Sequence, residues 1–336
     1  MTRREKPWLR AALPAQCLTM AAWIVFFSFS AGHRAHAQEY PAKPVRFILA
    51  FTAGGALDII GRVITRKMSE NLRVQMAVDN RPGAGGIIGT EAAAKASPDG
   101  YTIFLCNVTN AIYPGLYQKP VYDALRDFVA ISPGASFSFI LAVNPSMPVQ
   151  SVAQLVALAK KRPDDIVYGS SGIGSPPHLA GELMKNMTGM RMTHVPFAGN
   201  PQAQQSLVGG DIQVLFINTA NAMPLIDAKR VRGLAVSSLQ RSQVAPGFPT
   251  VAESGLPGFD ISSWGAFCGP ARTPEAIVNK LNSEVTKALE APDVKSRLLQ
   301  QGFEVTPMPP ARFQAYYKAE IEKYKKIIRD ANIEMQ

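Results

Sequence analysis

Short apolar runs alternate with amphipathic helical patterns along almost the whole chain. Each run has the length of a strand and is rich in β-branched or aromatic residues, and the segments between them repeat apolar residues at helical spacing. The expected strands cover residues 45–51, 101–106, 139–143, 166–169, 212–217 and 231–236. The expected helices cover residues 56–71, 87–96, 152–161, 176–188, 201–208, 274–289 and 312–328. This alternation is typical of parallel sheets flanked by helices and predicts an α/β fold.

The N-terminal residues 1–37 have the pattern of a secretory signal peptide. Four basic residues precede a mostly apolar stretch at 18–31, and Ala35-His36-Ala37 supplies a small-residue cleavage pattern. The alternative is a membrane anchor, but the apolar stretch is shorter than the ~20 residues that a spanning helix needs. We therefore expect cleavage near Ala37 and export of the remaining chain.

The remaining chain of about 300 residues is longer than a single hydrophobic core usually supports, which predicts two lobes. No low-complexity linker separates two sequential domains, so the lobes are expected to interleave. We assign residues 38–140 and 255–336 to domain 1 and residues 141–254 to domain 2.

The charge balance suits a small anionic ligand. The full chain has a net charge of +10, and without residues 1–37, which hold five basic residues and one acidic residue, the excess is +6. The basic residues are scattered, so this excess does not demand nucleic acid. Cys106 and Cys268 both lie in apolar segments; they are either buried free thiols, which we favour slightly, or a disulfide formed after export. Neither belongs to a metal-binding pattern, so no metal site is expected.

Glycines interrupt the chain where expected strands meet expected helices. Gly54 and Gly55 stand between the first strand and the first helix, and similar glycine- and serine-rich entrances occur at 83–89 and 169–175. Glycine leaves backbone N–H groups bare at a helix N-terminus, where they can hold an anion. Because ligands bind outside the carboxyl ends of strands in such sheets, these loops predict a site that grips a small anionic solute.

Motifs for catalysis or nucleotide binding are absent from the sequence. There is no G-x-S-x-G elbow and no phosphate loop ending in Gly-Lys-Ser/Thr. Residues 83–89 spell G-x-G-x-x-x-G, but they follow Asn80-Arg81-Pro82 rather than an unbroken strand, and we interpret 82–86 as a turn and helix start. His194 fits a structural role, and no pairing of nucleophile and base stands out. We expect no catalytic residue and no cofactor.

A series of short motifs in a fixed order gives the chain a family resemblance. They lie at residues 40–45, 54–58, 80–86, 98–102, 168–175, 194–199, 234–236 and 248–255, and at Trp264. With these motifs the chain resembles the Bug-type periplasmic solute-binding receptors of tripartite tricarboxylate transporters over residues 40–333. The resemblance implies a two-lobed periplasmic-binding-protein clamshell of type II-like design, each lobe a mostly parallel sheet flanked by helices. It also implies a monomer in the periplasm that binds a small carboxylate and meets integral-membrane transporter subunits.

The resemblance also implies a set of ligand-binding positions on two lobes. The loops involved would hold carboxylates through backbone N–H groups, small hydroxyls and bridging waters. The residues predicted to bind ligand are Thr52, Ala53, Gly54, Gly55, Leu57, Asp58, Asn107, Thr109, Ser170, Ser171, Gly172, Gly174, Ser175, His178, Phe197, Ala198, Gly199, Asn218 and Thr219. Asp58 has two interpretations. It is either an acid in the first turn of a helix with no role in binding, which we favour, or a partner for a ligand amine or a water. His178 either lines the pocket or is structural, because a positive histidine there would oppose the helix dipole.

Two departures from the family pattern make the predicted pocket more apolar. Leu57 stands where the family often has threonine, and Phe197-Ala198 replaces a common Tyr-Lys pair. We therefore predict a mono- or dicarboxylate with an apolar or aromatic body rather than a citrate-like polyanion. A sensor kinase in place of a permease is an alternative partner, and a secreted enzyme on this fold is a third, less favoured hypothesis.

Overall fold

The computed structural model describes residues 40–333, so the prediction of a signal peptide over residues 1–37 lies outside the described residues. The chain divides into two units at Ala42/Lys43, and the second unit contains all the elements described below. None of its described helices is both long enough and apolar enough to cross a membrane.

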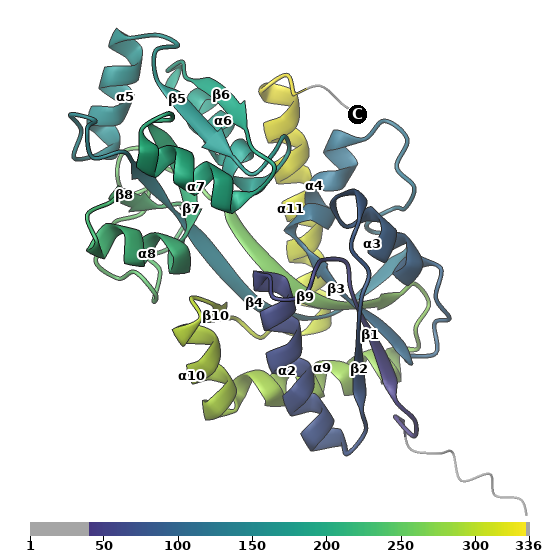
Figure 1. Ribbon diagram of the computed structural model, residues 1–336. Helices are drawn as coiled ribbons and strands as arrows, with labels where there is room; N and C mark the ends of the chain where they lie inside the picture. The colour runs from purple at the N-terminus through teal and green to yellow at the C-terminus, as the bar shows by residue number, and fades with distance from the viewer. Residues whose placement is uncertain (1–39, 334–336) are drawn as a thin grey trace, which may run out of the picture. The chain divides into compact units, whose positions relative to one another are not determined.

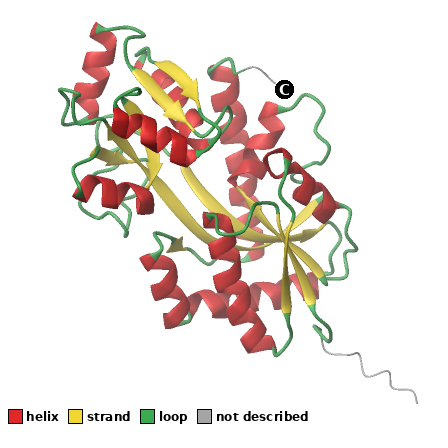
Figure 2. Cartoon of the chain, viewed as in Figure 1, coloured by secondary structure: helices red, strands yellow, loops and turns green. Residues whose placement is uncertain are grey.

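Ten strands of this unit form one mixed sheet (Figure 2). The first group of strands, here the first lobe, is β1 (Val45–Leu49), β2 (Met76–Asn80), β3 (Thr102–Asn107), β9 (Ser262–Pro270) and β10 (Glu304–Val305). The second group, here the second lobe, is β5 (Val167–Ser170), β6 (Thr193–Pro196), β7 (Val214–Asn218) and β8 (Arg232–Val236). The long strand β4 (Phe128–Val143) belongs to both groups (Figure 1).

Strand β4 passes from the first lobe to the second near its middle. Its residues up to Ser138 pair with β9, and its residues from Phe139 onward pair with β7 and β8. The predicted domain limits, 38–140 with 255–336 and 141–254, stay predictions.

The α/β class is confirmed, but the sheet is less parallel than expected. β1 pairs in parallel with β2 and β3, and β5 pairs in parallel with β6 and β7. Every described pairing of β4 and β9 is antiparallel. These two strands lie in the middle of the strand order, so they make the sheet mixed.

The helices cover the sheet through apolar stripes. In α2, for example, Ile60, Ile64 and Met68 recur every four residues and are fully buried, as expected for a helix with one face on a core. The helices are α2 (Ala56–Leu72), α3 (Ile87–Ala94) after the short η1 (Ala84–Gly86), α4 (Val108–Leu116), α5 (Val152–Lys161), α6 (Pro176–Thr188), α7 (Asn200–Gly209), α8 (Thr219–Asp227), α9 (Glu275–Glu290), α10 (Pro292–Gln300) and α11 (Pro310–Asp330). Figure 1 shows α2, α9 and α10 grouped together, and these three helices contact one another.

The two described cysteines form a disulfide, so the preference for free thiols was wrong. Cys106 of β3 and Cys268 of β9 are almost completely buried, and their Cα atoms are 5.9 Å apart. The antiparallel pairing of β3 with β9 brings these residues together across 162 positions of sequence. The sequence spacing carried no information on this pairing, because β9 was not among the expected strands.

The indole of Trp264 joins strand β9 to helix α11. Its Nε1–H donates to Oε2 of the buried Glu320 (3.0 Å), and its ring meets Tyr317 edge to face at 5.6 Å. Lys323 forms an ion pair with the same carboxylate of Glu320. The carboxylate is therefore paired as well as buried, which is the condition under which a buried charge is tolerated.

Candidate functional site

A cavity of about 340 Å³ lies where the starts of α3 and α4 face the loop that leads into α6. It therefore draws residues from both lobes. None of the described residues that line it carries a charged side chain. They are Phe51, Ala84, Gly85, Gly86, Ile87, Thr90, Asn107, Thr109, Asn110, Ile112, Tyr113, Leu116, Tyr117, Tyr122, Ser171, Ile173, Gly174, Ser175 and Pro176.

Aromatic rings make up one wall of this cavity. The Tyr113 ring stacks on that of Tyr122 with centroids 4.4 Å apart, and the centroid of the Tyr117 ring, just after α4, also lies 4.4 Å from that of Tyr113. Ile112 and Leu116 extend the apolar surface. A wall of this kind favours a ligand with a flat or apolar body, because aromatic side chains contribute large apolar contact areas.

Asn107 places an unpaired hydrogen-bond donor at this cavity. The residue ends β3 and caps α4: its Oδ1 accepts the N–H of Thr109 (2.9 Å), while its own N–H donates to Oδ1 of Asn110 (2.8 Å). Asn107 is 1% exposed, and its Nδ2 has no partner among the described residues. A buried donor left unsatisfied costs about 1–3 kcal/mol. An acceptor oxygen of a ligand in the cavity would remove that cost.

The first glycine loop binds a carboxylate of its own chain. The Gly54 N–H donates to Oδ2 of Asp58 (2.9 Å), and Nε of Arg62 lies 2.9 Å from both carboxylate oxygens. Asn80 Nδ2 donates to Oδ1 of Asp58 (2.9 Å) and to the carbonyl of Phe51 (3.0 Å). The expectation of a bare N–H at Gly54 is therefore wrong, because Asp58, one helical turn later, already occupies it.

The surroundings of Asp58 keep its carboxyl ionised. Burial raises its pKa, but the hydrogen bonds from Arg62, Gly54 and Asn80 together outweigh burial and leave the pKa below its ordinary value. This geometry supports the structural interpretation of Asp58. Of the segment 51–58, only Phe51 lines the cavity. Thr52, Ala53 and Gly55 are exposed and Leu57 is half-buried; their ligand roles, with those of Gly54 and Asp58, stay predictions.

In the second lobe, serines organise the loop between β5 and α6. Ser170 Oγ accepts the Gly172 N–H (3.1 Å) and lies 2.7 Å from Nε2 of His194. Ser175 Oγ donates to the Gly172 carbonyl (2.7 Å). Ser171 lines the cavity, and its hydroxyl forms no hydrogen bond to any residue in the described range. It is therefore a second donor available to a ligand, on the lobe opposite Asn107.

The start of α6 offers fewer backbone donors than its glycines suggest. Pro176 and Pro177 have no N–H. The Gly174 N–H donates to Nδ1 of His178 (3.0 Å). Gly174 has a φ of 75°, and a Cβ there would lie 2.3 Å from Leu116 of α4, so glycine allows this loop to approach the first lobe closely.

Two neutral histidines, His178 and His194, form hydrogen bonds with the loop between β5 and α6. The His178 and His194 rings stack with centroids 4.1 Å apart, and the ring of Tyr168 lies 4.8 Å from that of His194. Burial, the neighbouring His178 and Lys185 together lower the pKa of His194 to about 3. Burial, with a further contribution from Lys185, also lowers the pKa of His178, although Glu182 opposes this. His178 therefore accepts the Gly174 hydrogen bond as a neutral ring, and it does not line the cavity.

Lowering the pH from 7.5 to 5 is expected to destabilise the segment Gln38–Gln336 by about 1–2 kcal/mol. The folded pKa values of His178 and His194 are lowered, so the unfolded chain binds more protons once the pH falls below about 6.5. These are the only histidines after residue 37, and most carboxylates titrate below this window. Urea unfolding at both pH values measures the effect, and His194→Gln should reduce the slope. Equal stability at pH 5 and 7.5 would contradict this description of the pair.

Five of the residues predicted from sequence lie together at the cavity: Asn107, Thr109, Ser171, Gly174 and Ser175. Others face elsewhere in this structure. Phe197 packs against the core of the second lobe, and Thr219 Oγ1 donates to the carbonyl of Ser138 (2.8 Å). Asn218 caps α8 through the Ala220 N–H (2.9 Å). The ligand roles of these three residues, and of Ser170, Gly172, His178, Ala198 and Gly199, stay predictions.

The sequence interpretation did not single out the tyrosine wall, and it did not name residues 84–86 among the ligand-binding positions. Gly85 and Gly86 line the cavity, although 82–86 were interpreted mainly as a turn. The sequence feature that could have placed these residues at the site is the glycine cluster itself, because it resembles the other two glycine-rich helix entrances.

Comparisons with known proteins agree with this fold. The family described as tripartite tricarboxylate transporter family receptor matches residues 60–333. The chain is 32% identical to the protein BugT of Bordetella pertussis over 321 residues, which cover 94% of this chain and 98% of BugT. Among solved structures, an R. palustris protein with adipate is 33% identical, with a TM-score of 0.77 and coverage of 89% of this chain and 100% of that one.

A second solved structure, MatC from Rhodopseudomonas palustris with bound malate, is 28% identical, with a TM-score of 0.72. The match covers 86% of this chain and 100% of MatC. The family match spans most of the chain and includes α3, α4 and α6, whose starts surround the cavity. The chain belongs to the tripartite tricarboxylate transporter receptor family, as a solute-binding protein of the Bug type.

Proposed function

We propose that the protein is a periplasmic receptor that captures a small carboxylate in this cavity and delivers it to the integral-membrane subunits of a tripartite tricarboxylate transporter. The ligand is a mono- or dicarboxylate with an apolar or aromatic body. The receptor acts as a monomer after removal of its signal peptide. It performs no chemistry on the ligand and needs no cofactor.

The unpaired Nδ2 of Asn107 is the observation that carries this proposal. It is a buried amide donor at the cavity, fixed in place because the rest of the Asn107 side chain caps α4. A carboxylate oxygen is an acceptor that suits such a donor, and hydrogen bonds to charged groups contribute about 1.5–3 kcal/mol. The Ser171 hydroxyl can donate to the same ligand from the other lobe.

The lining supports the choice of ligand class. A citrate-like polyanion would bring several charges into a cavity whose described lining residues carry none, which is costly without cationic partners. One or two carboxylates on an apolar body fit two donors and a tyrosine wall better. The adipate and malate bound by the two related proteins are both dicarboxylates.

Family membership favours a transporter over a sensor kinase as the partner. It also favours binding over catalysis. The histidines nearest the cavity loop, His178 and His194, are engaged in loop hydrogen bonds and have lowered pKa values.

Thermal-shift binding tests the proposal on Gln38–Gln336, unfolded and refolded under oxidising conditions to remove bound ligand. The panel contains acetate, benzoate, adipate, malate and citrate. A ligand at a hundredfold excess over its Kd stabilises the folded state by about 2.7 kcal/mol. We expect a clear shift with at least one mono- or dicarboxylate and recovery of that ligand unchanged. Shifts with citrate alone would contradict the ligand class, and recovery of a converted product would contradict the receptor function.

A further inference from the structure

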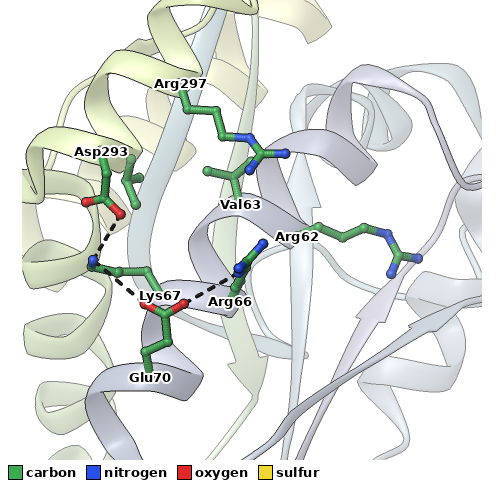
Figure 3. Close-up of a pocket in the computed structure, with 8 residues that line it drawn as sticks. Arg62, Val63, Arg66, Lys67, Glu70, Asp293 and Arg297 are labelled. Atoms are coloured by element: carbon green, nitrogen blue, oxygen red, sulfur yellow. Dashed lines mark hydrogen bonds and ion pairs between the residues drawn. The ribbon is translucent and has the colours of Figure 1, made fainter.

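A second hollow, of about 340 Å³, lies between helices α2 and α10, well outside the residues of the ligand cavity. We call it the α2–α10 groove (Figure 3). Its floor is apolar, because Val63 and Val294 are buried between the two helices. Its lining residues are Arg62, Val63, Arg66, Lys67, Glu70, Asp293, Val294 and Arg297.

Positive charge exceeds negative charge in this groove. Lys67 is held by two acids, with Nζ 3.0 Å from Asp293 and 3.7 Å from Glu70. Arg66 also forms an ion pair with Glu70, with Nε 3.5 Å from Oε1, and its side chain is largely exposed. Arg297 forms no ion pair with any residue in the described part of the chain, and Figure 3 shows its guanidinium reaching from α10 over Val63. The groove therefore presents Arg66 and Arg297 without full neutralisation.

Arg62 connects the rim of this groove to the first glycine loop. Figure 3 shows its guanidinium turned away from Lys67 and Glu70. That guanidinium bonds both oxygens of Asp58, and its Nη2 donates to Oδ1 of Asn80 (2.6 Å). Asp58 in turn holds the Gly54 N–H, so one side chain lines the groove and also orders the loop.

We propose that the α2–α10 groove docks an acidic segment of a partner protein, and that Arg62 transmits this docking to the glycine loop. Excess positive charge around an apolar floor complements a segment that carries both carboxylates and apolar side chains. An approaching carboxylate competes with Asp58 for Arg62 and so loosens the hydrogen bond at Gly54. The proposal does not depend on the identity of the ligand in the cavity.

A small free anion is a poorer occupant of this groove. The arginines are exposed, and isolated ion pairs at exposed positions contribute about 0–1 kcal/mol. Among the described residues, the two buried side-chain polar atoms without a partner belong to Asn107 and Tyr317, and neither residue lines the groove. An extended acidic segment gains from several charges and from contact with the valine floor at once.

Fluorescein-labelled hexaglutamate, titrated against Gln38–Gln336 at low ionic strength and followed by anisotropy, tests the docking. We expect saturable binding that Arg66→Glu/Arg297→Glu weakens by about tenfold or more. The matched control is Arg126→Glu/Arg272→Glu, which makes the same change in net charge at two exposed arginines outside the groove and should weaken binding by less than about threefold. Thermal melts establish whether both variants are folded. If Arg66→Glu/Arg297→Glu does not fold, Arg66→Gln/Arg297→Gln replaces it.

Three results would overturn the docking: no binding at low ionic strength, equal losses in both arginine pairs, or displacement of hexaglutamate by equimolar inorganic phosphate. The last would indicate a small-anion site. The link to the loop is tested by hydrogen exchange at the Gly54 amide, which hexaglutamate should accelerate several-fold in the wild type but not in Arg62→Gln. Unchanged exchange in the wild type with peptide bound would overturn the role given to Arg62.

Discussion

Asn107→Asp is expected to weaken carboxylate binding by about a hundredfold. The substitution keeps the side-chain oxygen that accepts the Thr109 N–H, and aspartate is as good a helix N-cap as asparagine. It removes the free Nδ2–H donor and puts a carboxylate in its place at the cavity. The lost charge-assisted hydrogen bond alone accounts for about 1.5–3 kcal/mol, or roughly ten- to 150-fold, and repulsion between the two carboxylates adds to it. Isothermal titration with the ligand found by thermal shift measures the change.

Asn218→Asp provides the matched control. Asn218 also caps a helix, through the Ala220 N–H, but it does not line the cavity. We expect affinity within about twofold of the wild type. A large loss in Asn218→Asp with little loss in Asn107→Asp would move the site to the α8 entrance, which the family resemblance also implied. Urea unfolding of both variants separates lost affinity from lost structure.

Removing the disulfide is expected to lower the free energy of unfolding by about 2–5 kcal/mol. The bond between Cys106 and Cys268 joins positions 162 residues apart and lies fully inside the core between β3 and β9. Cross-links that close long loops restrict the unfolded chain strongly. Cys106 also directly precedes Asn107, so loss of the bond should weaken ligand binding by loosening the α4 cap.

Urea unfolding of Cys106→Ala/Cys268→Ala, compared with the wild type with and without dithiothreitol, measures this effect. Dithiothreitol should shift the wild-type midpoint most of the way toward that of the variant, since both lack the bond, and should leave the variant unchanged. If the wild-type urea midpoint stays the same after the unfolded protein has been fully reduced by dithiothreitol, the disulfide does not stabilise the fold.

The elements found from sequence are those whose residues indicate strand or helix without help from the rest of the fold. β1 (VRFIL) and β7 (VLFIN) are each apolar at four of five positions and contain β-branched residues, and α2 and α11 have regular apolar stripes. β9 was missed because its sequence, SSWGAFCGP, contains no β-branched residue. It is a strand because β3 and β4 pair with it on both sides and bury it, which is a tertiary cause.

Prolines concealed two helices, of which α4 contributes to the cavity. Pro114 lies inside α4 and Pro224 inside α8, and proline in a helix interior normally argues against a helix. The tyrosine wall was therefore not anticipated, since Tyr113 depends on α4 for its position.

The binding residues were harder to predict than the fold, because a sequence does not show which donors are already occupied. Gly54 and Gly174 both offer an N–H group at a helix entrance. In the structure each is taken by a side chain four residues further on, Asp58 and His178. The free donor is instead an amide, Asn107 Nδ2, whose availability depends on how the other groups around it are paired.

The burial of Trp264 has a practical consequence. After residue 37 the chain contains no other tryptophan, so the indole emission of the segment Gln38–Gln336 reports on one location. That location is strand β9, where the ring is enclosed by aromatic side chains of α11 and bonded to Glu320. Since β9 runs beside β4, which spans both lobes, a change in the angle between the lobes would alter the surroundings of this fluorophore. Indole emission is therefore a probe with which lobe movement can be sought without an attached dye.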